Sequence, residues 1–171
     1  MKNYIHLLLF ICPILLFSQS NPFAKLKYDK VVAYEFQGEG DVLIIECLKN
    51  QNEKINKNKA LSKKETQSIE HILTSEKAYG KGKAFCFDPH FAIVYYLKDE
   101  IVCSIDICLD CNSLVSSIKI PATKLKYIKI GDDYSYPADG FSKISRKHIY
   151  EFCKALNFVK YLKPLESIYD D

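Results

Sequence analysis

The chain has 171 residues, of which 48% are hydrophobic, 13% aromatic and 26% charged, and its net charge is +3 at neutral pH. This hydrophobic and aromatic content excludes an intrinsically disordered chain. The lysines are scattered rather than gathered in a stripe, so we expect no nucleic-acid partner.

The first predicted element is a secretion signal over residues 1–20. One lysine precedes an apolar run that ends at Phe17, and this run is shorter than the about 20 residues that a membrane-spanning helix needs. Ser18 and Ser20 supply the small residues that signal peptidase reads, so we expect cleavage after Ser20. A retained membrane anchor is the alternative. After cleavage, residues 21–171 would form a single domain without a membrane span, exported to the periplasm or the extracellular space.

A β-hairpin and a polar loop are predicted next. Strands are expected over 30–36 and 41–48, which are rich in β-branched and aromatic residues and are separated by the turn glycines of QGEG. The stretch 49–60 is rich in Asn and Lys, which is typical of a solvated loop.

The middle of the chain is predicted to hold a helix and a second hairpin. The helix covers residues 61–73, because Ser62 and Glu65 have the spacing of a capping box and apolar residues follow at helical intervals. Strands over 91–97 and 101–107 are joined by a tight turn at KDE.

The last third is predicted to hold two strands, a loop and a helix. The strands cover 116–120 and 124–130 and are separated by Pro121, which interrupts a ladder. The loop covers 131–140 by its composition, and Ser145 caps the final helix. Together the elements predict an α+β domain with a mostly antiparallel sheet of about six strands and two packed helices.

Four of the seven cysteines lie between residues 86 and 112, on both sides of the second hairpin. A turn at Asp99 and Glu100 would fold one strand onto the other, so that Asp88 lies across from Cys111. Residues that are distant in sequence would then meet at the open end of the hairpin, which we call the hairpin mouth. The residues expected there are Cys86, His90, Cys108 and Cys111.

Three kinds of site fit this cluster. Exported proteins form disulfides, so a bond from Cys86 to either Cys108 or Cys111 is the leading hypothesis. The second is a structural zinc site with Cys86, His90, Cys108 and Cys111 as ligands. Zinc is the one cofactor that the sequence suggests. The third is a redox pair of Cys108 and Cys111. A β-rich stretch follows this pair instead of a helix, and the carboxylate of Asp110 disfavours a thiolate.

The remaining cysteines have apolar surroundings in sequence. Cys47, Cys103 and Cys153 are expected to be small buried side chains, although a bridge between Cys47 and Cys153 stays open. The sequence contains no motif of a known catalytic machinery, so we assign no catalytic residues.

The motif Cys-Phe-x-Pro-His followed by Ile-Cys-Leu-Asp-Cys-Asn resembles one found in an uncharacterised family of small exported bacterial proteins. The resemblance covers about residues 60–121 and implies no activity. It implies that six residues act as one unit: Cys86, Pro89, His90, Cys108, Cys111 and Asn112.

We therefore expect an exported cell-envelope module with a binding or structural role, held by a disulfide at the hairpin mouth. Its partner would be an unknown protein or small molecule. Metal-dependent or thiol-redox activity at the same cluster is the alternative.

Overall fold

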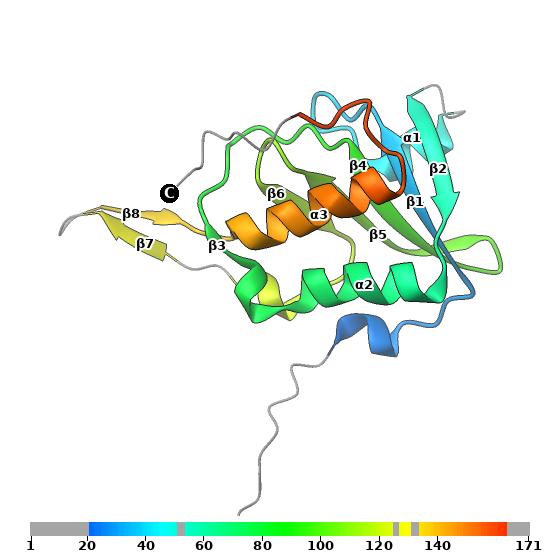
Figure 1. Cartoon of the computed structure of the whole chain (residues 1–171), viewed down its shortest axis with the longest axis horizontal. Helices are drawn as coiled ribbons and strands as arrows, with labels where there is room; N and C mark the ends of the chain where they lie inside the picture. Colours follow the sequence, from blue (N-terminus) through cyan, green and yellow to red (C-terminus); the bar gives the residue numbers. More distant parts are fainter. Residues whose placement is uncertain (1–20, 51–53, 125–126, 131–133, 164–171) are drawn as a thin grey trace, which may run out of the picture.

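The computed structural model of the protein describes residues 21–50, 54–124, 127–130 and 134–163. The predicted secretion signal therefore lies outside the described residues. The described part of the chain has an α+β fold, which confirms the predicted class (Figure 1). A five-stranded antiparallel sheet in the order β2-β1-β4-β5-β6 is accompanied by two small two-stranded sheets, β3-β9 and β7-β8.

Helices are interspersed among the strands along the described residues. The elements are β1 (Lys30–Phe36), α1 (Ile44–Lys49), β2 (Ile55–Ala60), α2 (Lys63–Thr74), β3 (Tyr79–Lys81), β4 (Phe91–Leu97), β5 (Glu100–Cys108), β6 (Ser113–Ser116), β7 (Tyr127–Ile130), β8 (Tyr134–Pro137), β9 (Gly140–Phe141) and α3 (Lys143–Ala155), with 3-10 turns at Pro22–Lys25, Glu76–Ala78 and Pro121–Thr123.

The large sheet has an apolar core on each face. On one face, α2 and α3 lie side by side (Figure 1), and Leu73 and Ile149 are fully buried in a cluster with Tyr95 from the centre of the sheet. On the other face, the short helix α1 buries Ile44 against strand residues such as Phe36. Full burial of one such aliphatic or aromatic side chain contributes about 1.5–3 kcal/mol, so both clusters stabilise the sheet.

Helix α2 forms as the sequence predicts, and its start shows why. Ser62 Oγ accepts a hydrogen bond from the Glu65 N–H at 3.3 Å, while the Glu65 carboxylate accepts one from the Ser62 N–H at 2.8 Å. Lys59 also donates to Glu65 at 2.8 Å, and these bonds, led by the one from Lys59, lower the pKa of Glu65 to about 2. The capping box satisfies two backbone groups that a helix end leaves unpaired.

The first predicted hairpin is wrong in its second half. Strand β1 is confirmed, but residues 44–49 form α1 instead of a strand, and its burial of Ile44 and Cys47 follows helical spacing. The partner of β1 is β2, inside the stretch 49–60 that reads as a polar loop. Strand β2 is an edge strand, where side chains stay largely exposed, so its polar composition concealed it.

The last third differs from the prediction in three places. The strand expected at 116–120 is β6 at Ser113–Ser116, and β8 lies within the expected loop 131–140. The cap of α3 is Ser142, whose Oγ accepts the Ser145 N–H at 3.3 Å, so Ser145 stands inside the first turn. Two serines three residues apart offer alternative caps, and the packing of buried Ser145 decides between them.

Candidate functional site

The β4–β5 hairpin creates the hairpin mouth, as predicted, but in a shifted register. Lys98 and Asp99 both have positive φ and form the turn, and a bulge at Tyr95 and Tyr96 follows. Phe91 pairs with Ile107, which differs by one position from the register that would place Asp88 across from Cys111. The turn lies one residue earlier than predicted, which moves the pairing by two positions, and the bulge moves it back by one because β5 carries one extra residue there.

The two cysteines of the CLDC sequence are bonded to each other. Cys108 ends β5, and Cys111 lies in the turn before β6. Their Cα atoms are 5.2 Å apart, and their sulfur atoms are at disulfide distance. The turn closes at Asn112, which has a φ of 55° and donates its N–H to Leu109 O at 3.3 Å. Asparagine is one of the few residues that adopt this left-handed conformation readily, so the sequence favours the turn that brings the sulfur atoms together.

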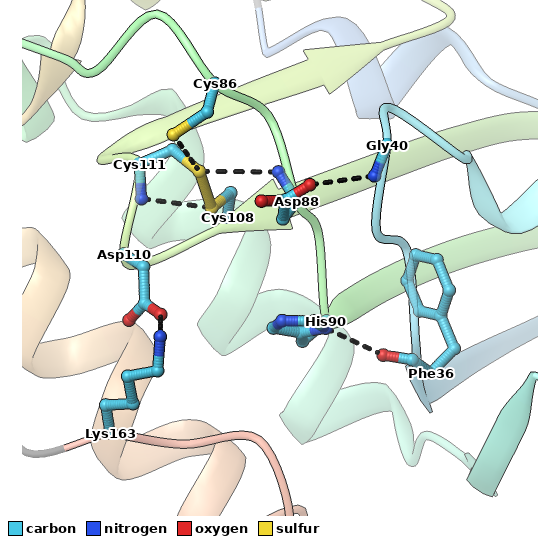
Figure 2. Close-up of a disulfide and its surroundings, with 9 residues drawn as sticks. All are labelled: Phe36, Gly40, Cys86, Asp88, His90, Cys108, Asp110, Cys111 and Lys163. Atoms are coloured by element: carbon cyan, nitrogen blue, oxygen red, sulfur yellow. Dashed lines mark hydrogen bonds and ion pairs between the residues drawn. A yellow bond between two sulfur atoms is a disulfide. The ribbon is translucent and has the colours of Figure 1, made fainter.

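Cys86 contacts this disulfide without taking part in it. Its exposed thiol lies 3.7 Å from Cys111 Sγ, and the Asp88 N–H donates to the same sulfur at 3.4 Å (Figure 2). The leading hypothesis, a bond from Cys86 to one of the other two, differs from the pairing that the structure shows. The tight turn at 109–112 gives Cys111 a nearer partner in Cys108.

His90 faces away from the sulfur atoms. Its Nδ1 atom lies 3.1 Å from Phe36 O, and its ring stacks on Tyr161 at 4.7 Å between centroids. Figure 2 shows the imidazole below the disulfide, with its marked interaction directed to Phe36. The predicted zinc ligands therefore do not assemble, and the described residues contain no group of three metal ligands.

Asn112 links the cysteine turn to two other segments. Its buried side-chain amide donates to Gly82 O at 2.7 Å and to Phe141 O at 3.1 Å. Gly140 passes so close that a Cβ atom there would lie 2.7 Å from Asn112 Nδ2. The backbone N–H of Ala84 also donates to Cys111 O at 2.9 Å. The turn thus holds the loop 82–88 and strand β9 in place.

Charged groups around the cluster are paired. Asp110 lies 2.6 Å from Lys163, and this hydrogen bond is the main reason why the pKa of Lys163 is raised (Figure 2). Asp88 Oδ1 accepts the Gly40 N–H at 2.9 Å. The ammonium of Lys163 offsets the carboxylate that the sequence places inside the CLDC motif. No local signal pointed to Lys163, because it comes from the C-terminal segment.

Among the described residues, the other cysteines are Cys47, Cys103 and Cys153, and they are buried and free, which confirms their prediction as small core residues. Burial raises the pKa of each thiol, so all three are poor nucleophiles. Cys47 packs on the α1 side of the sheet and Cys153 on the α3 side, so the sheet separates them and excludes a bridge between them.

A groove adjoins the loop 82–88 beside β6. Its volume is about 250 Å³, and its lining includes Lys83, Ser113, Leu114 and Asp139. Lys83 and Asp139 form an ion pair of 2.7 Å across one part of the lining. No sequence pattern indicates this groove, because its walls come from separate segments of the chain.

No known protein family, curated protein or solved structure matches the chain. Within the described residues, every helix is too short or too polar to cross a bilayer. The site is therefore interpreted from its own geometry.

Proposed function

We propose that the protein is an exported cell-envelope binding module that displays the loop 82–88 to a partner protein. The observation that carries the proposal is Phe85, whose side chain is fully exposed at the centre of this loop. Large aromatic side chains are enriched among the residues that dominate binding energy at protein interfaces.

The loop is fixed on both sides of Phe85. Before it, Gly82 O accepts a hydrogen bond from the Asn112 side chain, and the Ala84 N–H donates one to Cys111 O. After it, Asp88 contacts Cys111 and Gly40. A loop that is held before binding loses little conformational entropy when it binds, which favours affinity.

The groove beside β6 adds a polar neighbour to the aromatic anchor. Lys83 belongs to both the loop and the groove, and Ser113 and Asp139 offer further polar groups. An apolar anchor next to polar groups is the usual arrangement of a protein interface. These features favour a polypeptide partner over a small apolar ligand.

Export rests on the segment 1–20 and on the chemistry of the cluster. Disulfides persist in oxidising compartments and are rare in the cytosol, so the Cys108–Cys111 pair supports an exported protein. A fractionation experiment tests this part. We expect the chain recovered from the envelope fraction to begin at Asn21, whereas a cytosolic chain that begins at Met1 would refute export.

Binding is tested by site-specific photo-crosslinking in the cells of origin. The crosslinker replaces Phe85 in one variant and the exposed Ile144 of α3 in a control. We expect an adduct from position 85 alone, and we expect purified wild-type protein, but not a Phe85→Ala variant, to compete it away. Equal adducts from both positions, or competition by Phe85→Ala, would contradict the proposal.

A further inference from the structure

We infer that Cys86 lets the buried Cys108–Cys111 disulfide oxidise the thiols of a partner polypeptide, by thiol–disulfide exchange through Cys86. The inference does not rest on the proposed binding role, because its first step takes place within the chain.

The three cysteines differ in their access to solvent. Cys108 and Cys111 are 1% and 2% exposed, so a thiol from outside cannot reach their bond directly. Cys86 is exposed and contacts that bond from the solvent side. Access to the attacked sulfur is one of the factors that set exchange rates, so Cys86 provides the route between solvent and the buried disulfide.

The sulfur atoms are arranged in the order that exchange requires. Figure 2 shows Cys111 Sγ between the sulfur atoms of Cys86 and Cys108. The distance from Cys86 to Cys111 is 3.7 Å, which is a contact distance for an attacking atom. Attack on Cys111 therefore expels Cys108, the sulfur on the opposite side.

Backbone N–H groups support both sulfur atoms of the bond that breaks. Cys108 Sγ accepts the Cys111 N–H at 3.0 Å, and this bond would stabilise the departing thiolate. Cys111 Sγ accepts the Asp88 N–H at 3.4 Å. Lys163 pairs with Asp110, so the carboxylate inside the CLDC motif is offset by a positive charge.

The internal step balances without any added reagent. The Cys86 thiolate attacks Cys111 Sγ, a Cys86–Cys111 bond forms, and the Cys108–Cys111 bond breaks. The electron pair of the broken bond stays on Cys108, which takes up the proton that Cys86 has released. The chain holds one disulfide before and after, and the new disulfide reaches the surface at Cys86.

The second step needs a dithiol, and we assign it to a polypeptide. One thiolate of the partner attacks Cys86 and releases Cys111, which forms a mixed disulfide. The other partner thiol then attacks the partner sulfur of the mixed disulfide and releases Cys86. The partner leaves oxidised by two electrons, and the protein keeps three reduced thiols. Phe85, fully exposed beside Cys86, offers apolar contact that favours a polypeptide over a small polar thiol.

The internal step is tested by disulfide mapping of the full chain after acid quenching. In a Cys108→Ala variant we expect a Cys86–Cys111 disulfide to form in a glutathione redox buffer without any partner. Cys86 and Cys111 that both stay reduced, in a variant with a wild-type circular dichroism spectrum, would overturn the inference. Wild-type protein needs no substitution, and we expect a minor Cys86–Cys111 isomer in it under the same conditions; its absence would also overturn the inference.

The relay is tested with a reduced model peptide that contains two cysteines and one phenylalanine. We expect Cys86→Ser to lower the rate of peptide oxidation at least about tenfold, because the disulfide then reacts only after local opening. A rate within about twofold of wild type would overturn the relay. Cys153→Ala serves as the control with a distant thiol removed.

A Phe85→Ala variant separates this inference from the proposed function. We expect it to keep the internal exchange in full while failing to compete against the adduct formed from position 85. Loss of both the internal exchange and the binding would mean that the substitution disrupts the fold of the loop, and it would overturn the separate role of Cys86.

Discussion

The two faces of β5 carry the same residue type with different chemistry. On one face, Cys103 lies among Ile105 and Ile107 in the cluster that α2 and α3 cover. Asp106 and Cys108 alternate with these residues and face the other way. Cys103 is a buried, inert thiol, whereas Cys108 is oxidised and in reach of an exposed thiol through Cys111. The comparison shows that neighbours, and not residue type, decide what a cysteine does.

The second face of β5 also tolerates a buried carboxyl group. Asp106 is 1% exposed, and burial raises its pKa to about 6. Its Oδ1 atom accepts the Ile44 N–H at 2.7 Å, at the start of α1. This hydrogen bond satisfies a backbone group that would otherwise be unpaired at the helix end. A polar group on this face is kept because it holds a second element in place.

The largest expected difference is in thiol reactivity. We expect iodoacetamide to modify Cys86 at least about a thousandfold faster than Cys103 in the native protein, because a buried thiol reacts only when the core opens. A time course analysed peptide by peptide measures both rates, with Cys47 and Cys153 as further buried controls. Comparable rates for Cys86 and Cys103 would contradict the distinction between the buried core thiol and the exposed thiol beside the disulfide.

The next largest effect concerns Asp106 and pH. The folded-state pKa of about 6 lies above the ordinary value of 3.8, so the folded state binds the extra proton between these values. This group therefore contributes stability that is present at low pH and is lost as pH rises through about 6. An Asp106→Asn variant lacks that dependence, so the free-energy difference between the two proteins should change by about 2.4 kcal/mol from pH 4 to pH 7.

Urea unfolding at several pH values measures this change. Asp106→Asn keeps an oxygen acceptor for Ile44 and should be the more stable protein at pH 7. Asp99→Asn, at the exposed turn of the same hairpin, is the matched control and should show only a small effect. Parallel pH profiles for wild type and Asp106→Asn would contradict the interpretation of a buried, charged carboxylate.

The smallest effect compares the buried Cys103 with the exposed Cys86 when the sulfur of each is replaced by oxygen. Cys103→Ser places a hydroxyl group in the apolar cluster and should lower the free energy of unfolding by about 1–3 kcal/mol. Cys86→Ser lies in the exposed loop and should change it by about 0.5 kcal/mol or less. Thermal unfolding of both variants measures the difference. A Cys103→Ala control separates loss of packing from the buried hydroxyl, and equal stability of the two serine variants would contradict the comparison.

Local signals predicted the parts of the fold that local chemistry determines. The capping box of Ser62 and Glu65 predicted α2, and two apolar segments joined by a tight turn predicted β4 and β5. Helix α1 escaped prediction because its start depends on Asp106, a residue far away in sequence. Strand β2 escaped because an edge strand needs little hydrophobicity.

The sequence predicted where the site lies, but not its disulfide pairing, the register of its hairpin or the position of His90. The hairpin brought Cys86, Cys108 and Cys111 together as expected. The disulfide pairing depended on the left-handed conformation of Asn112, and the register depended on a turn at Lys98 and Asp99 together with the bulge at Tyr95. The place of His90 depended on Phe36 and Tyr161, which no spacing rule connects to it.

The position of Cys86 has a consequence for how firmly the polypeptide is tied. The Cys108–Cys111 bond joins residues 3 apart, whereas a Cys86–Cys111 bond would join residues 25 apart. By loop-closure entropy, the first restrains the unfolded chain by about 2 kcal/mol and the second by about 3.5 kcal/mol. A shift of one bond between neighbouring sulfur atoms would therefore replace a crosslink within one turn by a crosslink that closes a loop containing β4 and β5, with no change in oxidation state.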